Sequence, residues 1–262
     1  IRSYAVFDYL KAKLKGTGDN DGYVISADVL SATQFGAPQK RMRFVVMGIR
    51  KDITDEVKLP EGKFKNGPYR TVEDAIKDLE DVAPVYNVSD DKDGIKLQEK
   101  TDLSELAQLL RDSEILHNHI ITKTTKTAME RFRALDQGQN FHSLSNEMKI
   151  NTYTDVTRTQ NTIYLRLKYD EPSGTVVNVR KSMWVHPTQD RAVSIREAAR
   201  LQTFPDSFIF YGTKDKQYQQ VGNAVPPIMA KAIAKKLAQQ LRKAEDKFGV
   251  NQSPTVNPNE GV

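Results

Sequence analysis

Apolar positions in the first fifty residues change from helical to strand-like spacing. In residues 3–14 they recur every three or four positions and predict a helix with one apolar face, made of Tyr4, Phe7, Leu10 and Leu14. Residues 23–30 (YVISADVL) and 43–50 (RFVVMGIR) are predicted strands, and the second is too apolar to be exposed to water on both faces. A helix, a strand, a loop and a second strand in this order predict the closing edge of an α/β sheet.

From residue 51 to 193 the pattern is irregular and rich in loops, which predicts a second lobe. Thr71 and Asp74 have the spacing of a capping-box variant. Three helices are expected, over 69–80, 102–111 and 125–135. Two strands joined by a turn are expected, over 161–170 (NTIYLRLKYD) and 174–180 (GTVVNVR).

Regular helical spacing returns after residue 193. Ser194 and Glu197 have capping-box spacing at the start of a helix over 194–202. A glycine–asparagine turn is expected at 222–223, followed by a long helix with two prolines, 226 and 227, in its first turn, where a missing N–H costs little. The tail over 246–262 is expected to be disordered.

Composition narrows the class of protein. The 262 residues carry a net charge of +5 with a sequence pI near 9.1, which fits a polyanionic partner. The absence of cysteine excludes disulfides, cysteine-ligated zinc and a cysteine nucleophile within this sequence. No metal site is expected. The HNH tripeptide at 117–119 is not the HNH nuclease motif, because the residues of that motif are dispersed along the sequence. Four histidines without any cysteine also make a zinc site unexpected. No apolar run approaches the ~20 residues that a membrane span needs, so no membrane partner is expected.

One loop concentrates polar chemistry ahead of the second predicted strand. Gln39, Arg41 and Arg43 alternate by two, so in an extended segment their side chains share one side. The arginine fork pairs with phosphate or with a base carbonyl in a way that lysine does not imitate. From the spacing alone, a solvated strand end explains the same residues equally well.

Four segments carry a resemblance to a known family: QFGAPQKRMRFVVMGIR (34–50), EPSGTVV (171–177), SIREAARLQTFPDSF (194–208) and QYQQVGNAVPP (217–227). Together and in this order they resemble the last conserved blocks of the DNA cytosine-5 methyltransferases. The resemblance implies an α/β fold, with the closing part of a Rossmann-like methyltransferase domain and a small irregular α+β target-recognition domain. Four parts are then expected: 1–50 as the edge of the catalytic domain, 51–193 as the recognition domain, 194–245 as a bracing helix and a returning C-terminal helix, and 246–262 as the tail.

The family's chemistry implies roles for these residues. A cytosine is flipped out of double-stranded DNA, a cysteine thiolate adds to carbon 6, and carbon 5 takes a methyl group from S-adenosylmethionine. By resemblance, Arg43 would bond the cytosine carbonyl oxygen, Arg41 would hold flanking phosphates or support the pocket, and Gln39 would brace the loop. The implied DNA-binding residues are Thr175, Arg41, Arg180 and Lys181. The implied cofactor-binding residues are Asn223, Ala224 and Val225.

The block at 194–208 implies structure and not catalysis. An ion-paired brace for the recognition lobe is expected from Arg191, Arg196, Arg200 and Asp206. Trp184 either packs at the lobe junction or lines the DNA surface, and the sequence leaves both open.

Three features of the family are absent from this sequence: the Pro-Cys nucleophile, the glycine-rich cofactor loop and the Glu-Asn pair that holds the cytosine. Together with a first residue that is not methionine, this leads us to expect the C-terminal part of an enzyme, inactive alone, whose partner is a missing N-terminal catalytic half in the same or a separate polypeptide. A bacterial cytoplasmic setting near the nucleoid and a link to restriction–modification follow from the resemblance. Two alternatives are a DNA-binding module that has lost catalysis and an RNA cytosine methyltransferase. The apolar stripe of the last helix argues against the first: Ile228, Met229, Ile233 and Leu237.

Overall fold

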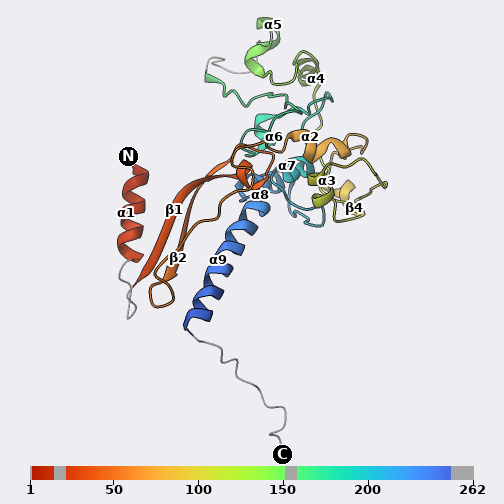
Figure 1. Ribbon diagram of the computed structural model, residues 1–262. Coiled ribbons are helices and arrows are strands. Elements are labelled where there is room, and N and C mark those ends of the chain that lie inside the picture. The colour runs from red at the N-terminus through yellow and green to blue at the C-terminus, as the bar shows by residue number, and fades with distance from the viewer. Residues whose placement is uncertain (1, 15–21, 151–157, 249–262) are drawn as a thin grey trace, which may run out of the picture. The chain divides into compact units, whose positions relative to one another are not determined.

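A computed structural model describes residues 2–14, 22–150 and 158–248 of the chain (Figure 1). The chain divides into two compact units. The first unit comprises residues 1–30, 43–61 and 231–262, and the second comprises 31–42 and 62–230. None of the described helices is long and apolar enough to cross a membrane.

The first unit contains a helix and a two-stranded sheet, as the sequence predicts. Helix α1 is Arg2–Leu14, and strands β1 (Tyr23–Ser31) and β2 (Met42–Arg50) pair with each other (Figure 1). The C-terminal part of α9 (Pro227–Phe248) also belongs to this unit. Its core is built from alternate residues of β2 and one stripe of α9: Met47, Ile49, Ile233, Leu237 and Leu241.

The two faces of β2 differ in exposure. Met47 and Ile49 on one face of β2 are buried, as expected for a strand too apolar to be exposed on both faces, whereas on the other face the side chain of Phe44 is 53% exposed, and Val29 on β1 is 50% exposed. Phe44 has an edge-on contact with Phe7 of α1, at 5.0 Å between ring centroids. In the sheet that the described residues form, β2 has β1 as its neighbour, and this leaves the apolar face around Phe44 partly uncovered.

The second unit is built from short helices and loops. Capping boxes begin α2 at Thr71 and Asp74, and α7 at Ser194 and Glu197, which confirms both sequence predictions. The helices are α2 (Val72–Ile76), α3 (Glu105–Leu110), α4 (Lys126–Arg133), α5 (Asn146–Lys149), α6 (Val179–Ser182), α7 (Ile195–Leu201) and α8 (Lys214–Asn223). Among the described residues, 3₁₀ turns are formed by η1 (Ala32–Phe35), η2 (Lys77–Leu79), η3 (Val88–Asp91) and η4 (Phe141–Ser143). A short antiparallel pair joins β3 (Ile95–Lys96) and β4 (Ile115–Leu116).

Several apolar clusters hold this unit together. One of them packs α2, α3, α7 and α8 around Trp184, which is 1% exposed. Trp184 is therefore a core residue, which rules out a position on the DNA surface. Another cluster secures α4, with Phe132, Phe141 and Tyr164 at its centre.

The two strands predicted over 161–170 and 174–180 are wrong. Backbone groups there bond to several loops in turn and form no ladder: Arg166 exchanges hydrogen bonds with 138–139, whereas Leu167 donates to Val185. Tyr164 has a φ of 55°, which interrupts an extended strand. Residues 174–180 pass through irregular backbone into α6.

Two more expectations concern the C-terminal region. Gly222 and Asn223 are the last residues of α8 and not a turn. Pro227 lies in the first turn of α9 as predicted, whereas Pro226 precedes the helix. Most of the expected disordered tail, 249–262, lies outside the described residues. The expected domain boundaries stay a prediction; in the structure, 194–230 belong to the same compact unit as 62–193.

Candidate functional site

The loop that carries Gln39 and Arg41 is shaped by its backbone. Gly36 ends η1 with a φ of 92°, in the left-handed region that favours glycine. The Ala32 N–H donates to the Arg41 carbonyl at 2.8 Å and closes the loop. As a result the side chains of Gln39 and Arg41 are 0% and 1% exposed, so this stretch is not a solvated strand end.

The loop is joined to the segment at 173–176, far along the chain. Lys40 N donates to the Ser173 carbonyl at 2.7 Å, and Ser173 N donates to the Pro38 carbonyl at 2.9 Å. The Thr175 hydroxyl donates to the Lys40 carbonyl at 2.8 Å. The structure therefore brings together two of the segments that the resemblance assigned to the target base and the DNA backbone.

Gln39 bonds in three directions. Its Nε2 donates to the Gln202 Oε1 at 2.7 Å and to the Leu201 carbonyl at 3.0 Å. Its Oε1 accepts from Val176 N at 3.2 Å. This geometry fits a bracing role, because a buried amide with several partners holds its loop in one position.

Arg41 is directed into the protein. Its Nη1 donates to the Val176 carbonyl at 2.8 Å and its Nη2 donates to the Gly222 carbonyl at 2.9 Å. Of the two roles left open for Arg41, this burial favours support of the pocket over a contact with phosphate.

The other residues expected to act in catalysis or to bind the cofactor differ in their exposure to solvent. Arg43 lies in β2 and is half-buried. Asn223, the last residue of α8, and Val225, between α8 and α9, are exposed, and Ala224 is half-buried. Ile228 N donates to the Thr203 hydroxyl at 3.2 Å, which fixes the start of α9 just beyond them.

Arg180 and Lys181 lie on α6 and are exposed. Both line a groove of about 480 Å³, together with Lys123 and Asp215. Arg180 forms an ion pair with Asp215 at 3.1 Å. Hydrogen bonding from Asn178 and the neighbouring Arg180 lower the pKa of Asp215, so this carboxylate stays charged. The groove presents cations to solvent, which fits a polyanion.

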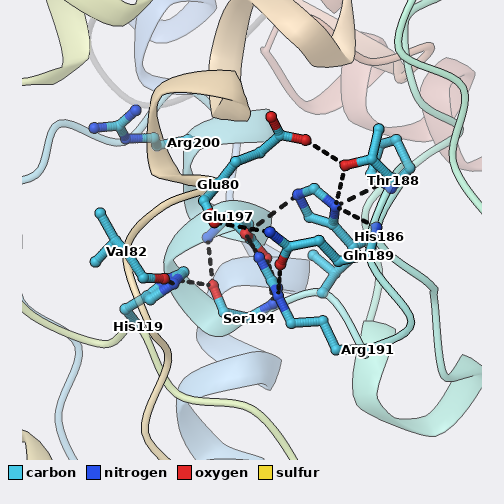
Figure 2. A network of polar contacts seen from close by, with 12 residues as sticks. Glu80, Val82, His119, His186, Thr188, Gln189, Arg191, Ser194, Glu197 and Arg200 are labelled. Atoms are coloured by element: carbon cyan, nitrogen blue, oxygen red, sulfur yellow. Dashed lines mark hydrogen bonds and ion pairs between the residues drawn. The ribbon is translucent and has the colours of Figure 1, made fainter. Parts of the chain in front are cut away.

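The second unit also contains a buried charged network, shown in Figure 2. Arg191 donates to both carboxylate oxygens of Glu197, at 2.8 and 2.6 Å. Burial raises the pKa of Glu197, but the Arg191 charge and its hydrogen bonds outweigh this and hold the pKa well below its ordinary range. Glu197 also accepts from Ser194 N at 2.8 Å, so one carboxylate both caps α7 and pairs with the arginine.

Two buried histidines flank Glu197, and their neighbours define their tautomers (Figure 2). The Nδ1 of His186 accepts from the backbone N–H groups of 188 and 189, so its Nε2 carries the proton and lies 3.7 Å from Glu197. His119 donates from Nε2 to the Val82 carbonyl and accepts from Ser194. Burial lowers the pKa of His186 to about 4 and also lowers that of His119. Both rings are therefore neutral at pH 7.

The ion pairs expected around Arg200 and Asp206 are present, whereas their role as a brace for a recognition domain stays a prediction. Arg200 donates two parallel hydrogen bonds to Asp206, with the Nε bond at 2.9 Å, and a third to Asp78, 122 residues earlier. Arg196 donates to the carbonyls of His117 and Phe208, each at 2.8 Å. The sequence pattern did not indicate Asp78 as a partner of Arg200, because Asp78 is one acidic residue among many in a short helical segment.

The HNH tripeptide has structural contacts. Asn118 has a φ of 64° and its side chain donates to the Phe210 carbonyl at 2.9 Å, and His119 is bound as described above. Within the described ranges, no three His, Asp or Glu side chains are grouped to hold a metal ion.

Comparison with known proteins gives the family. The family described as C-5 cytosine-specific DNA methylase matches residues 6–239. The chain is 28% identical over 244 residues to the type II methyltransferase M.DdeI of Desulfomicrobium norvegicum, covering 88% of the chain and 58% of that protein. It is 32% identical over 213 residues to the type II methyltransferase M1.HphI of Haemophilus parahaemolyticus, covering 81% and 47%.

A solved structure gives the fold. A crystal structure described as a DNA modification methyltransferase encoded within an E. coli prophage superposes with a TM-score of 0.68 at 24% identity. The superposition covers 92% of this chain and 66% of the chain in that crystal structure. The α/β methyltransferase fold is thereby confirmed, whereas the division into a closing Rossmann part and a recognition domain stays a prediction.

The chain belongs to the C-5 cytosine-specific DNA methylase family. The names of its relatives confirm the expected link to DNA methylation and to type II restriction–modification methyltransferases. The chain spans about half the length of the curated relatives that it matches.

Proposed function

We propose that this chain is the target-recognising and cofactor-completing part of a DNA (cytosine-5)-methyltransferase. The enzyme would transfer a methyl group to carbon 5 of a cytosine flipped out of a specific duplex sequence. One observation carries the proposal: buried hydrogen bonds from Arg41 join the loop at 36–41, the segment 173–176 and the end of α8. These are the segments that the resemblance assigns to the target base, the DNA backbone and the cofactor.

In this proposal Arg43 contacts the substrate, whereas Arg41 supports the pocket without contacting the substrate. Arg43 donates a hydrogen bond to the carbonyl oxygen of the flipped cytosine and stabilises the negative charge that develops on the ring. Arg41 positions the backbone at Val176 and Gly222. Thr175, which is half-buried, contacts the DNA backbone beside the flipped nucleotide.

The residues at the end of α8 and just after it fit S-adenosylmethionine, which enzymes of this family use as methyl donor. Asn223 offers an amide to polar groups and Val225, 45% exposed, offers an apolar contact. Ala224 lies between them with a small side chain that leaves room for a ligand. When bound, S-adenosylmethionine supplies the methyl group. The role of this chain is to hold one side of it, at the junction of α8 and α9.

Duplex DNA would lie against the second unit. Arg180, Lys181 and Lys123 contact phosphates along the groove beside α6, which positions the duplex without reading its bases. Residues 51–193 are proposed as the recognition domain, and 194–245 as the brace and returning helix beside the catalytic edge at 1–50.

The cysteine nucleophile, the glycine-rich cofactor loop and the Glu-Asn pair would come from polypeptide outside these 262 residues, in the same chain or in a separate subunit. The 262 residues contain no cysteine, so we expect no methyl transfer from them alone. The exposed apolar side chains of Val29 and Phe44 support this, because a two-stranded sheet with an apolar face fits coverage by further polypeptide.

Bisulfite sequencing tests the proposal. Cells would express residues 1–262 alone, or together with the polypeptide encoded directly upstream. Methylcytosine at one defined motif when both are present, and none with residues 1–262 alone, is the expected result. Methylation by residues 1–262 alone would overturn the assignment of the nucleophile. No methylation in either case, with duplex binding retained, would favour a binding module, and methylation of RNA would favour the RNA alternative.

A further inference from the structure

Val176 has both of its backbone groups held by the arginine loop. Its N–H donates to the Gln39 Oε1 at 3.2 Å, and its carbonyl accepts from the Arg41 Nη1 at 2.8 Å. All three residues are 0% or 1% exposed. In a buried site such hydrogen bonds are stronger than in water and costly to leave unmade.

The same two side chains also reach the end of α8. The Arg41 Nη2 donates to the Gly222 carbonyl at 2.9 Å. Gln39 donates to Gln202, whose Nε2 in turn donates to the Val221 carbonyl at 2.7 Å. Two parallel hydrogen-bonded paths therefore run from Val176 to two successive carbonyls of α8, one through Arg41 and one through the two glutamines.

Backbone packing reinforces the same junction. A Cβ at residue 222 would lie 2.7 Å from the carbonyl carbon of Val177 and 3.1 Å from Asn178 N. Asn178 also bonds Asp215 of α8 at 3.3 Å. The segment after Thr175 and the end of α8 thus form one packed contact, and a shift of either requires the other to move.

The chemistry of Arg41 suits this position. A planar guanidinium presents several donors in a fixed fork and holds two carbonyls at a set separation. The single ammonium of lysine is a point charge on a flexible stem and does not fix that separation.

We propose that Arg41, assisted by the Gln39–Gln202 amide pair, is a positioning residue that couples DNA binding at 175–177 to cofactor binding at 223–225. This deepens the proposed function and rests on it. Each ligand orders the backbone segment that it touches, and Arg41 transmits that order to the other segment. Each ligand therefore raises the affinity for the other, by the same factor in both directions.

The test measures that factor in the reconstituted enzyme, residues 1–262 with the polypeptide that supplies the nucleophile. S-adenosylhomocysteine is the probe, because it binds without turnover, and its Kd is measured by calorimetry with and without a saturating duplex that contains the target sequence. We expect the duplex to lower the Kd by about tenfold or more, within the range of ordinary coupling. For Arg41→Lys we expect that ratio to fall below about threefold. The control is Arg50→Lys, an exposed arginine paired with Asp52, which leaves the ratio unchanged.

The ratio separates positioning from general damage. A merely structural role would weaken both affinities and leave their ratio intact, whereas a coupling role lowers the ratio. Failure of the wild-type enzyme to bind either ligand would overturn the proposed function. Binding of both ligands with no coupling, or with the same coupling in folded Arg41→Lys, would overturn this inference alone. If Arg41→Lys does not fold, Gln202→Met decides by interrupting the amide path: reduced coupling supports the inference and full coupling overturns it.

Discussion

Gly222 lies so close to Val177 that a Cβ at residue 222 would stand 2.7 Å from the carbonyl carbon of Val177 and 2.8 Å from its oxygen. Gly222 is helical and does not need glycine for its backbone angles, because its φ is outside the left-handed region. The glycine is required by the close approach of two backbone segments.

We therefore predict that Gly222→Ala separates the end of α8 from Val177. The added methyl group meets backbone atoms, which do not rotate away as a flexible side chain does. The free energy of unfolding is expected to fall by about 1–3 kcal/mol, as for overpacked cores. Urea denaturation measures it. The matched control is Gly174→Ala, whose Cβ would have its nearest neighbour, Trp184 Cζ2, 4.0 Å away. Equal stability of the two variants would contradict the prediction.

Stability should also depend on pH through His186. Burial holds the pKa of this ring at about 4, against 6.5 for an ordinary histidine. Between these values the unfolded chain binds a proton that the folded chain does not, so the free energy of unfolding falls as pH falls. His186 alone should account for a loss of about 2 kcal/mol between pH 7 and pH 5. The lowered pKa of His119 acts in the same direction.

Urea denaturation at a series of pH values measures this slope. His186→Gln removes one titrating group, so the variant should lose less stability between pH 7 and pH 5 than the wild type, whatever its stability at pH 7. The assignment to His186 is wrong if His186→Gln keeps the wild-type slope.

Features with local signals are predictable from the sequence. The capping boxes of α2 and α7 depend on residues three positions apart, so the spacing of Thr71–Asp74 and of Ser194–Glu197 is enough to identify them. The helices and strands of the first unit follow from apolar spacing in the same way. The brace is also partly visible, because Arg200 and Asp206 are six residues apart.

Features that depend on distant partners are not predictable in this way. The spacing of Arg41 places it on an outward face shared with Arg43, but its acceptors are Val176 and Gly222, which lie 135 and 181 residues away. Residues 161–170 have the composition of a strand, yet their backbone groups find partners in separate loops. Composition and spacing encode neither kind of pairing, because both are decided by tertiary contacts.

If DNA binds in the groove beside α6, its affinity should depend on salt concentration through the lysines there. If Lys181 contacts a phosphate, Lys181→Ala removes one counterion-releasing contact, and the slope of log Kd against log salt should decrease by about 1. The loss of affinity should be similar for specific and non-specific duplexes, because phosphate contacts carry no sequence information. Fluorescence anisotropy at several salt concentrations measures both. Lys92→Ala, at an exposed lysine that does not line the groove, is the matched control. An unchanged slope for Lys181→Ala would remove this residue from the DNA interface.

Arg43 of β2 is expected to affect the chemical step, unlike the buried Arg41 of the loop. Arg43 is proposed to act on the charge that develops in the cytosine ring, so its contribution grows in the transition state and is small in the bound ground state. In the reconstituted enzyme, Arg43→Ala should therefore lower kcat by about 10²–10³-fold, as for the loss of one donor to a developing oxyanion, and leave most duplex binding intact. Single-turnover transfer of a labelled methyl group and anisotropy with the same duplex measure the two quantities.

Arg50→Ala, seven residues further along β2, is the control and should change neither quantity, because its side chain is engaged with exposed Asp52. An Arg43→Ala enzyme that methylates at the wild-type rate would refute the role given to Arg43. A variant that loses duplex binding and kcat together would instead show that Arg43 holds the DNA in the ground state, since uniform binding and transition-state stabilisation affect the two measurements differently.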